Sequence, residues 1–134
     1  MSLYKTTDRF LNNYNFLKNS LKREPTLEEI SDIDQLHYNG INAVNEAILK
    51  TKINQSSFVL DIGSGIGGPA RYIANKTKAT IYALEIQNEL NLIAKKLTLN
   101  YKLEKNINHI EGDILIHDLK ILNLIILWVG LLYI

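Results

Sequence analysis

A glycine-rich segment between a buried strand and a helix is the part of the sequence best suited to binding chemistry. Gly63, Gly65 and Gly67 directly follow the apolar run SFVLDI, and Gly68-Pro69 opens a helical pattern. Glycine lets the backbone turn sharply where the strand ends, and it leaves space for a ligand lying against the loop. The spacing therefore predicts a nucleoside-type cofactor at the N-terminus of the helix. The alternative is a turn that only packs the helix on the sheet.

Two acidic residues at strand ends indicate which cofactor the loop would hold. Asp61 precedes Gly63 at the tip of the first strand, and Glu85 ends the following strand. A carboxylate at the second position can accept hydrogen bonds from both ribose hydroxyls. A carboxylate at Asp61 would repel the pyrophosphate of a dinucleotide, but it suits the positive ammonium and sulfonium of S-adenosyl-L-methionine. The sequence therefore favours this cofactor over NAD. If the loop bound NAD instead, the chain would be an oxidoreductase domain.

The predicted elements that position these residues are N-terminal helices followed by alternating strands and helices. Helical spacing comes first, with Pro25 ending one helix and Thr26 with Glu29 forming a capping box for the next. Strands and helices then alternate with short connections, which predicts an α/β fold with a Rossmann-like parallel sheet of about four strands. We expect residues 1–50 to form an N-terminal helical cap on a cofactor-binding domain of residues 51–134. The predicted helices are 8–22, a short one from Thr26, 40–50, 68–77 and 88–102, and the predicted strands are 57–62, 79–85, 106–111 and 124–129.

Composition narrows the possible partners. The 134 residues suit one domain, and 15 Lys and Arg against 14 Asp and Glu give a net charge of +1, which argues against nucleic acid. The chain has no cysteine, and His37, His109 and His117 lack zinc spacing, so no metal site is expected. The start of the chain does not resemble a signal peptide, and the apolar run 121–134 is shorter than the roughly 20 residues that span a membrane. A cytoplasmic protein without a membrane anchor is expected.

The glycine-loop sequence also resembles a known family. Residues 59–68, VLDIGSGIGG, resemble motif I of class I S-adenosylmethionine-dependent methyltransferases. Together with residues 69–71, PAR, the stretch is similar to methyltransferases that act on sarcosine, dimethylglycine or phosphoethanolamine. Residues 34–38, DQLHY, resemble the segment that precedes the fold in that group. Gly112-Asp113-Ile114 resembles the position where an acid of the family meets the adenine amino group.

This resemblance implies a methyltransferase with S-adenosyl-L-methionine as cofactor and a small molecule, typically an amine, as methyl acceptor. His37 and Tyr38 would lie over the cofactor as a lid or substrate contact, or else form an ordinary loop pair. No residue is assigned as the general base. The residues expected to bind the cofactor are Asp61, Gly63, Ser64, Gly65, Gly67, Glu85, Ile86 and Asp113.

The C-terminal part departs from the family pattern. Leu122-Asn123 stands where the family commonly has an aromatic–aspartate pair, and the pattern reaches four strands where the family fold has seven. We therefore expect a truncated form of the fold, in which the fourth strand is an apolar edge prone to self-association. A non-catalytic cofactor-binding fragment is the alternative function under this interpretation.

Overall fold

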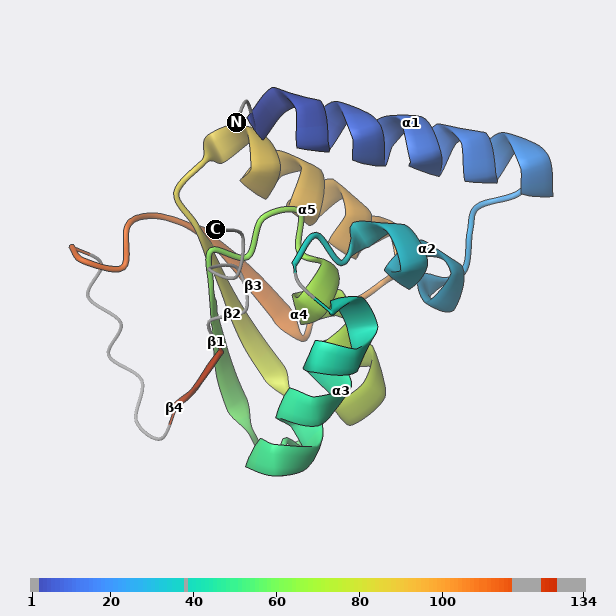
Figure 1. Ribbon diagram of the computed structural model, residues 1–134. Coiled ribbons are helices and arrows are strands. Elements are labelled where there is room, and N and C mark those ends of the chain that lie inside the picture. The colour runs from blue at the N-terminus through green and yellow to red at the C-terminus, as the bar shows by residue number, and fades with distance from the viewer. Residues whose placement is uncertain (1–2, 38, 117–123, 128–134) are drawn as a thin grey trace.

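The computed structural model describes residues 3–37, 39–116 and 124–127 (Figure 1). Helices come first, and strands then alternate with helices as far as β3, as the sequence pattern predicts. Within these residues, none of the helices is both long and apolar enough to cross a membrane. The helices are α1 (Leu3–Leu21), α2 (Leu27–Asp34), α3 (Gly40–Thr51), α4 (Gly68–Thr77) and α5 (Asn88–Asn100), and the strands are β1 (Phe58–Ile62), β2 (Thr80–Glu85), β3 (Ile107–Glu111) and β4 (Leu124–Leu127).

The strands form one parallel sheet in the order β3-β2-β1-β4. Asp61 pairs with Ala83 across β1 and β2, and Glu85 pairs with Glu111 across β2 and β3. Parallel pairing brings the carboxyl ends of neighbouring strands to the same edge, so residues far apart in sequence meet there. The predicted Rossmann-like sheet is confirmed.

Three helices cover the same side of the sheet. Figure 1 shows α3, α4 and α5 on one side of β1, β2 and β3. Alternate strand residues point toward these helices, as the period of two requires, and pack with apolar helix residues into one core. The side chains of this core come from β1–β3, α3, α4 and the connecting segments: Val44, Ile48, Ile53, Val59, Ala70, Ile73, Ala74, Ala79, Ile81, Ala83, Leu103 and Ile107.

A second apolar cluster joins the N-terminal helices to the glycine loop. Phe10 of α1, Ile30 of α2 and Leu97 of α5 are buried together with Ile66, which belongs to the loop after β1. The predicted capping box of α2 is present: the Glu29 N–H donates to Thr26 Oγ1 at 3.2 Å, and the Thr26 N–H donates to Glu29 Oε2 at 2.8 Å. Helix α2 therefore begins at a defined residue, and together with α1 it packs directly on the loop.

Helix α1 differs from the sequence-based prediction at its start. Helix α1 begins at Leu3, five residues before the predicted start at 8. Residues 3–7 show no apolar periodicity, but extending a formed helix by a turn requires little free energy. The buried stripe of α1 follows Phe10 and Tyr14, whereas Leu11 is 38% exposed. The predicted end of the fourth strand at 128–129 lies outside the described residues.

Four helices are followed by a lysine with a left-handed backbone. Lys22, Lys52, Lys78 and Lys102 come after α1, α3, α4 and α5, with φ between 54° and 62°. At Lys52 and Lys78 this conformation lets the cap N–H donate to a carbonyl of the last turn. Glycine adopts this region freely, whereas a residue with a Cβ is strained there by about 1–2 kcal/mol.

Candidate functional site

The glycine loop is hydrogen-bonded to the carboxyl end of β2. The N–H groups of Gly63 and Ser64 both donate to the Leu84 carbonyl, at 2.9 and 3.0 Å. The Gly65 N–H donates to Glu85 Oε2 at 2.8 Å. Successive loop amides therefore converge on the end of the neighbouring strand, and the loop leads directly into α4.

The glycines of the loop face two different environments. Gly63 and Gly65 have φ of +68° and +55°, and a Cβ built on either would meet none of the described atoms within 4 Å. A Cβ on Gly67 would instead lie 2.9 Å from Arg71 Nη1 and 3.1 Å from His109 Cε1, and one on Gly68 would lie 2.3 Å from the Asp34 carbonyl oxygen. The first two glycines thus leave the outer side of the loop open, and the other two make room inside the protein.

Glu85 is buried at the end of β2 and still has hydrogen-bonding capacity. The residue is 5% exposed. Oε2 accepts the Gly65 N–H, and Oε1 accepts the Gln87 N–H at 2.9 Å. An ionised carboxylate has about four acceptor positions, so each oxygen can accept one more bond. The geometry is compatible with a diol, such as the ribose hydroxyls that the sequence predicts for this position.

Asp61 is a buried carboxyl group with an unsatisfied oxygen. It is 1% exposed, and Oδ2 has no hydrogen-bond partner within the described structure. Burial raises the pKa of Asp61 to about 7, and the nearby negative charge of Glu85 contributes in the same direction. Two acids at adjoining strand ends with no described cation between them form a site that favours a positively charged ligand.

Two further buried polar side chains near this edge also lack partners. Ser64 is 5% exposed and its Oγ has no described partner, while Asn91 of α5 is 1% exposed and neither its Oδ1 nor its Nδ2 has one. Buried polar groups are normally hydrogen-bonded, so such atoms are candidates for contact with a ligand or water. Ser64 was among the predicted residues. Asn91 was not, because the sequence alone indicates an exposed position for an asparagine in a helix. Its burial depends on how the helix packs.

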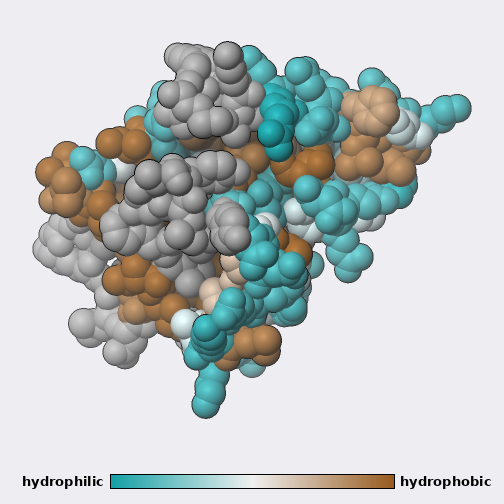
Figure 2. Space-filling view, in the orientation of Figure 1, coloured by the Kyte–Doolittle hydropathy of each residue, from teal (hydrophilic) through white to brown (hydrophobic). Residues whose placement is uncertain are grey.

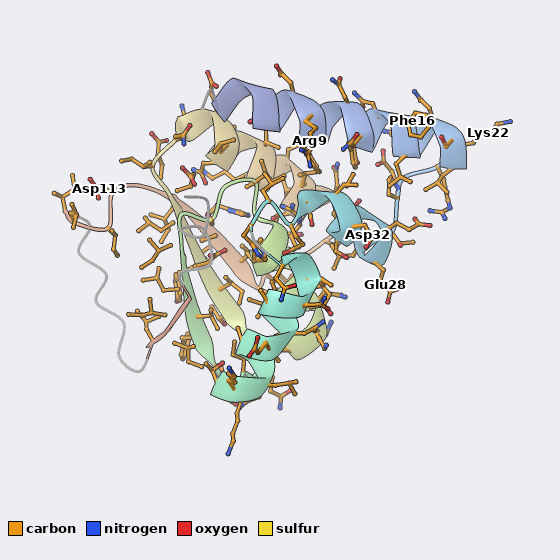
Figure 3. The ribbon with its side chains drawn as sticks, viewed as in Figure 1. Arg9, Phe16, Lys22, Glu28, Asp32 and Asp113 are labelled. Carbon is orange, nitrogen blue, oxygen red and sulfur yellow. The ribbon has the colours of Figure 1, made fainter. Side chains whose placement is uncertain are left out.

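The segment after β3 adjoins the same edge. The Gly112 N–H donates to the Glu85 carbonyl at 3.0 Å, which places Asp113 shortly beyond the site. Asp113 is partly buried, and its Oδ1 accepts the Leu115 N–H at 2.9 Å. Figure 3 shows Asp113 at the outer tip of this segment. Ile86, the last predicted contact, is 61% exposed.

Exposed apolar side chains surround Asp113. Ile114, Leu115 and Ile116 are 38%, 86% and 85% exposed. Figure 2 shows hydrophobic side chains gathered on this projecting segment. Together with Ile86 they supply apolar surface beside Glu85 and Asp113. This combination is suited to a flat ring that carries an amino group.

The histidines have distinct environments. His37 is 8% exposed, and its Nε2 lies 3.0 Å from Gln35 Oε1. His109 Nε2 pairs with the Thr98 hydroxyl at 2.7 Å, and burial, with the positive charges of Arg71 and Lys95, lowers its pKa to about 4. His109 is therefore neutral near pH 7. Tyr38 and His117 lie outside the described residues.

Sequence reasoning missed a buried ion pair beside the loop. Arg71 Nη2 lies 3.0 Å from Asp34 Oδ2, and the two side chains are 0% and 1% exposed. Arg71 Nη1 also donates to the Ile66 carbonyl at 2.6 Å. Both residues lie within stretches that resemble the family, and this resemblance was the signal that could have marked them as functional. Nothing in their spacing predicts that they contact each other.

Curated proteins with related sequences are methyltransferases. Over 71 residues, or 53% of this chain, the sequence is 34% identical to the sterol 24-C-methyltransferase of Clavispora lusitaniae. Over 65 residues, or 48% of the chain, it is 34% identical to the phosphoethanolamine N-methyltransferase of Plasmodium falciparum. The chain resembles the class I S-adenosylmethionine-dependent methyltransferases. These methyltransferase alignments span 19% and 24% of the two relatives, so the chain matches about a fifth to a quarter of their length. No family model matches the sequence.

Solved methyltransferase structures share the fold. An RNA methyltransferase from Salinibacter ruber, solved with S-adenosyl-L-homocysteine, superimposes with a TM-score of 0.55 at 21% identity, covering 57% of this chain and 50% of that one. A methyltransferase from Thiobacillus denitrificans, also solved with S-adenosyl-L-homocysteine, gives 0.54 at 17% identity, covering 62% of this chain and 34% of that one. The expected methyltransferase fold is thereby confirmed for the part of the chain that these structures cover.

Proposed function

We propose that this chain is the cofactor-binding region of an S-adenosylmethionine-dependent methyltransferase, with residues 1–50 as a helical cap on residues 51–134. The observation that carries the proposal is the pair of buried acids beside an open glycine loop. Asp61 has an unpartnered oxygen, and Glu85 can accept two further hydrogen bonds. A nicotinamide dinucleotide would place its pyrophosphate beside these negative charges, which is unfavourable.

Each predicted contact has a defined role in this proposal. Asp61 would pair with the ammonium group, Glu85 would accept the ribose hydroxyls, and Asp113 with Ile86 would bind the adenine. Gly63 and Gly65 would lie against the ligand because their outer side is open, the unpartnered hydroxyl of Ser64 would hydrogen-bond to it, and Gly67 would shape the turn. When bound, S-adenosyl-L-methionine supplies an activated methyl group on a sulfonium. The work of the chain is to orient the cofactor and exclude water from it.

We propose a small molecule as the methyl acceptor, and an amine as its chemical class. The similarity to the phosphoethanolamine N-methyltransferase supports an amine, and the similarity to the sterol 24-C-methyltransferase supports a sterol as the alternative. A methyl-transfer assay on phosphoethanolamine, sarcosine, dimethylglycine and a sterol distinguishes the two classes. Turnover of the sterol alone would contradict the amine proposal, and cofactor binding with no turnover would favour a non-catalytic binding fragment.

Replacing Glu85 with alanine tests the cofactor site. We expect affinity for S-adenosyl-L-homocysteine, measured by calorimetry, to fall by about tenfold or more, because each hydrogen bond to a charged acceptor contributes about 1.5–3 kcal/mol. Glu104→Ala is the matched control, since Glu104 is exposed in a turn. Unchanged affinity in a folded Glu85→Ala protein would remove Glu85 from the site. Tighter binding of NAD than of S-adenosyl-L-homocysteine would contradict the proposed function.

We also propose that the isolated chain self-associates through β4. Ile126 pairs with Leu60 in register and is 62% exposed, and exposed apolar strand edges promote pairing between chains. Ile126→Lys should reduce the apparent mass measured by light scattering. Leu49→Lys, at a 77% exposed position on α3, is the control and should leave the mass unchanged. A monomeric wild-type chain, or equal effects of the two lysines, would contradict association through the strand.

A further inference from the structure

The guanidinium of Arg71 lies directly beneath the glycine loop. Arg71 belongs to α4 and is 0% exposed. Its Nη1 donates to the carbonyl of Ile66 in the loop at 2.6 Å, and a Cβ on Gly67 would lie 2.9 Å from the same nitrogen. Gly67 therefore leaves room for a cation inside the protein, and that cation fixes the direction of a loop carbonyl.

The other side of the guanidinium is joined to the end of α2. Arg71 Nη2 donates to Asp34 Oδ2 at 3.0 Å, and Asp34 Oδ1 accepts a bond from Gln35 Nε2 at 2.9 Å. Gln35 Oε1 in turn lies 3.0 Å from His37 Nε2. Polar contacts thus run without a gap from the Ile66 carbonyl to His37.

Backbone packing also brings the end of α2 against the first turn of α4. A Cβ on Gly68 would lie 2.3 Å from the Asp34 carbonyl oxygen, so the end of α2 rests against the first turn of α4. An apolar pair of similar size would often stabilise such a position as well as a buried ion pair does. Directional bonds at both ends of the guanidinium, by contrast, fix the relative positions of the two segments that they join.

We propose that Arg71 is a positioning residue that holds the glycine loop and the His37 segment in a fixed relative position. It acts on the loop directly and on His37 through Asp34 and Gln35. This inference rests on the proposed cofactor site. It predicts that Gln35, which contacts neither Arg71 nor the loop in the described hydrogen bonds, influences cofactor binding only while Arg71 keeps both of its bonds. A lysine at 71 retains the positive charge but cannot donate in two directions in the same fixed geometry.

A double-mutant cycle tests the coupling. Gln35→Ala, Arg71→Lys and the double variant are titrated with S-adenosyl-L-homocysteine at a temperature where each is folded, and their thermal midpoints are recorded. We expect Gln35→Ala to weaken binding about fivefold in the wild-type background and by less than about twofold in the Arg71→Lys background, since residues acting through one network are not additive. Gln55→Ala, at an exposed position in a turn, is the matched control and should change neither quantity. If Arg71→Lys does not fold, Asp34→Asn takes its place in the cycle.

A ligand-free measurement separates this inference from the proposed function. Amide hydrogen exchange at Gly67, whose N–H donates to the Ser64 carbonyl at 2.9 Å, reports opening of the loop. We expect faster exchange there in Arg71→Lys and in Gln35→Ala, but not in Gln55→Ala. Additive effects on binding together with unchanged exchange would overturn the positioning role while leaving the cofactor site intact. If the wild type did not bind S-adenosyl-L-homocysteine, the proposed function would fail, and the exchange data alone would decide whether Arg71 and Gln35 position the loop.

Discussion

Replacing Asp61 with asparagine should raise the free energy of unfolding at pH 8. Well below pH 4, where Asp61 is protonated in both the folded and the unfolded protein, the substitution should remove no charge and bring no such gain. The folded-state pKa of Asp61 is about 7, against a usual value of 3.8. Between these values the unfolded chain releases the proton while the folded protein retains it. The contribution of Asp61 to stability is therefore fully present below pH 3.8 and is lost as the pH rises to about 7.

The expected size follows from the shift. A difference of about three pKa units corresponds to roughly 4 kcal/mol. The free energies of unfolding of wild type and Asp61→Asn are measured by denaturant unfolding at several pH values between 4 and 8. The difference between the two proteins should change by this amount across that range. Asp32→Asn, at an exposed position on α2, is the control. A difference between Asp61→Asn and wild type that stayed constant across this range would show that Asp61 ionises normally in the folded protein.

The same substitution should impair the site. Without the carboxylate, the ammonium of the cofactor loses its charged partner, and affinity for S-adenosyl-L-methionine should fall by about tenfold or more at pH 8. A variant that gains stability and loses binding would identify Asp61 as a group retained for function at a cost to the fold. Gain of stability with unchanged binding would place the cofactor elsewhere.

Gly68→Ala should cause the largest loss of stability among the loop glycines. Its Cβ would lie 2.3 Å from the carbonyl oxygen of Asp34 and 2.9 Å from the carbonyl carbon, and both are backbone atoms of α2. Overpacking alone costs about 1–3 kcal/mol, and displacing α2 would also disturb the Asp34–Arg71 pair, whose loss costs about 3–5 kcal/mol. Thermal unfolding should show a markedly lower midpoint.

Gly65→Ala is the matched comparison because its Cβ would enter open space. Its positive φ of +55° means that alanine is strained by about 1–2 kcal/mol, so a smaller stability loss is expected. Its main effect should be weaker binding of S-adenosyl-L-homocysteine, since the methyl group would occupy the ligand side of the loop. Equal melting of the two variants would contradict the division of the loop into an outer and an inner side.

Local pattern predicted most of the fold. The apolar run before Gly63, the proline near the start of α4 and the alternation that follows are properties of neighbouring residues, and the strands and helices lie where these patterns indicate. The beginning of α1 was predicted less well, because residues 3–7 have no periodic signal although a helix can extend through them.

The residues of the proposed site can be selected from the sequence, but the contacts among them cannot. Asp61 and Glu85 could be placed because strand ends in a parallel sheet share an edge. The bond between Asp34 and Arg71 joins residues 37 positions apart, and the burial of Asn91 depends on how α5 packs. Neither leaves a periodic trace in the sequence, because both depend on tertiary packing.

The lysines at the helix ends show where the folded chain holds conformational strain. Lys22, Lys52, Lys78 and Lys102 adopt a left-handed backbone in which glycine is at ease. Each ends its helix at a fixed point, with a positive charge near the negative end of the helix dipole as partial compensation. All four lie at helix termini, away from the glycine loop. The scaffold of this protein could therefore evolve greater thermal tolerance at its helix ends without any change to the residues that would hold the cofactor.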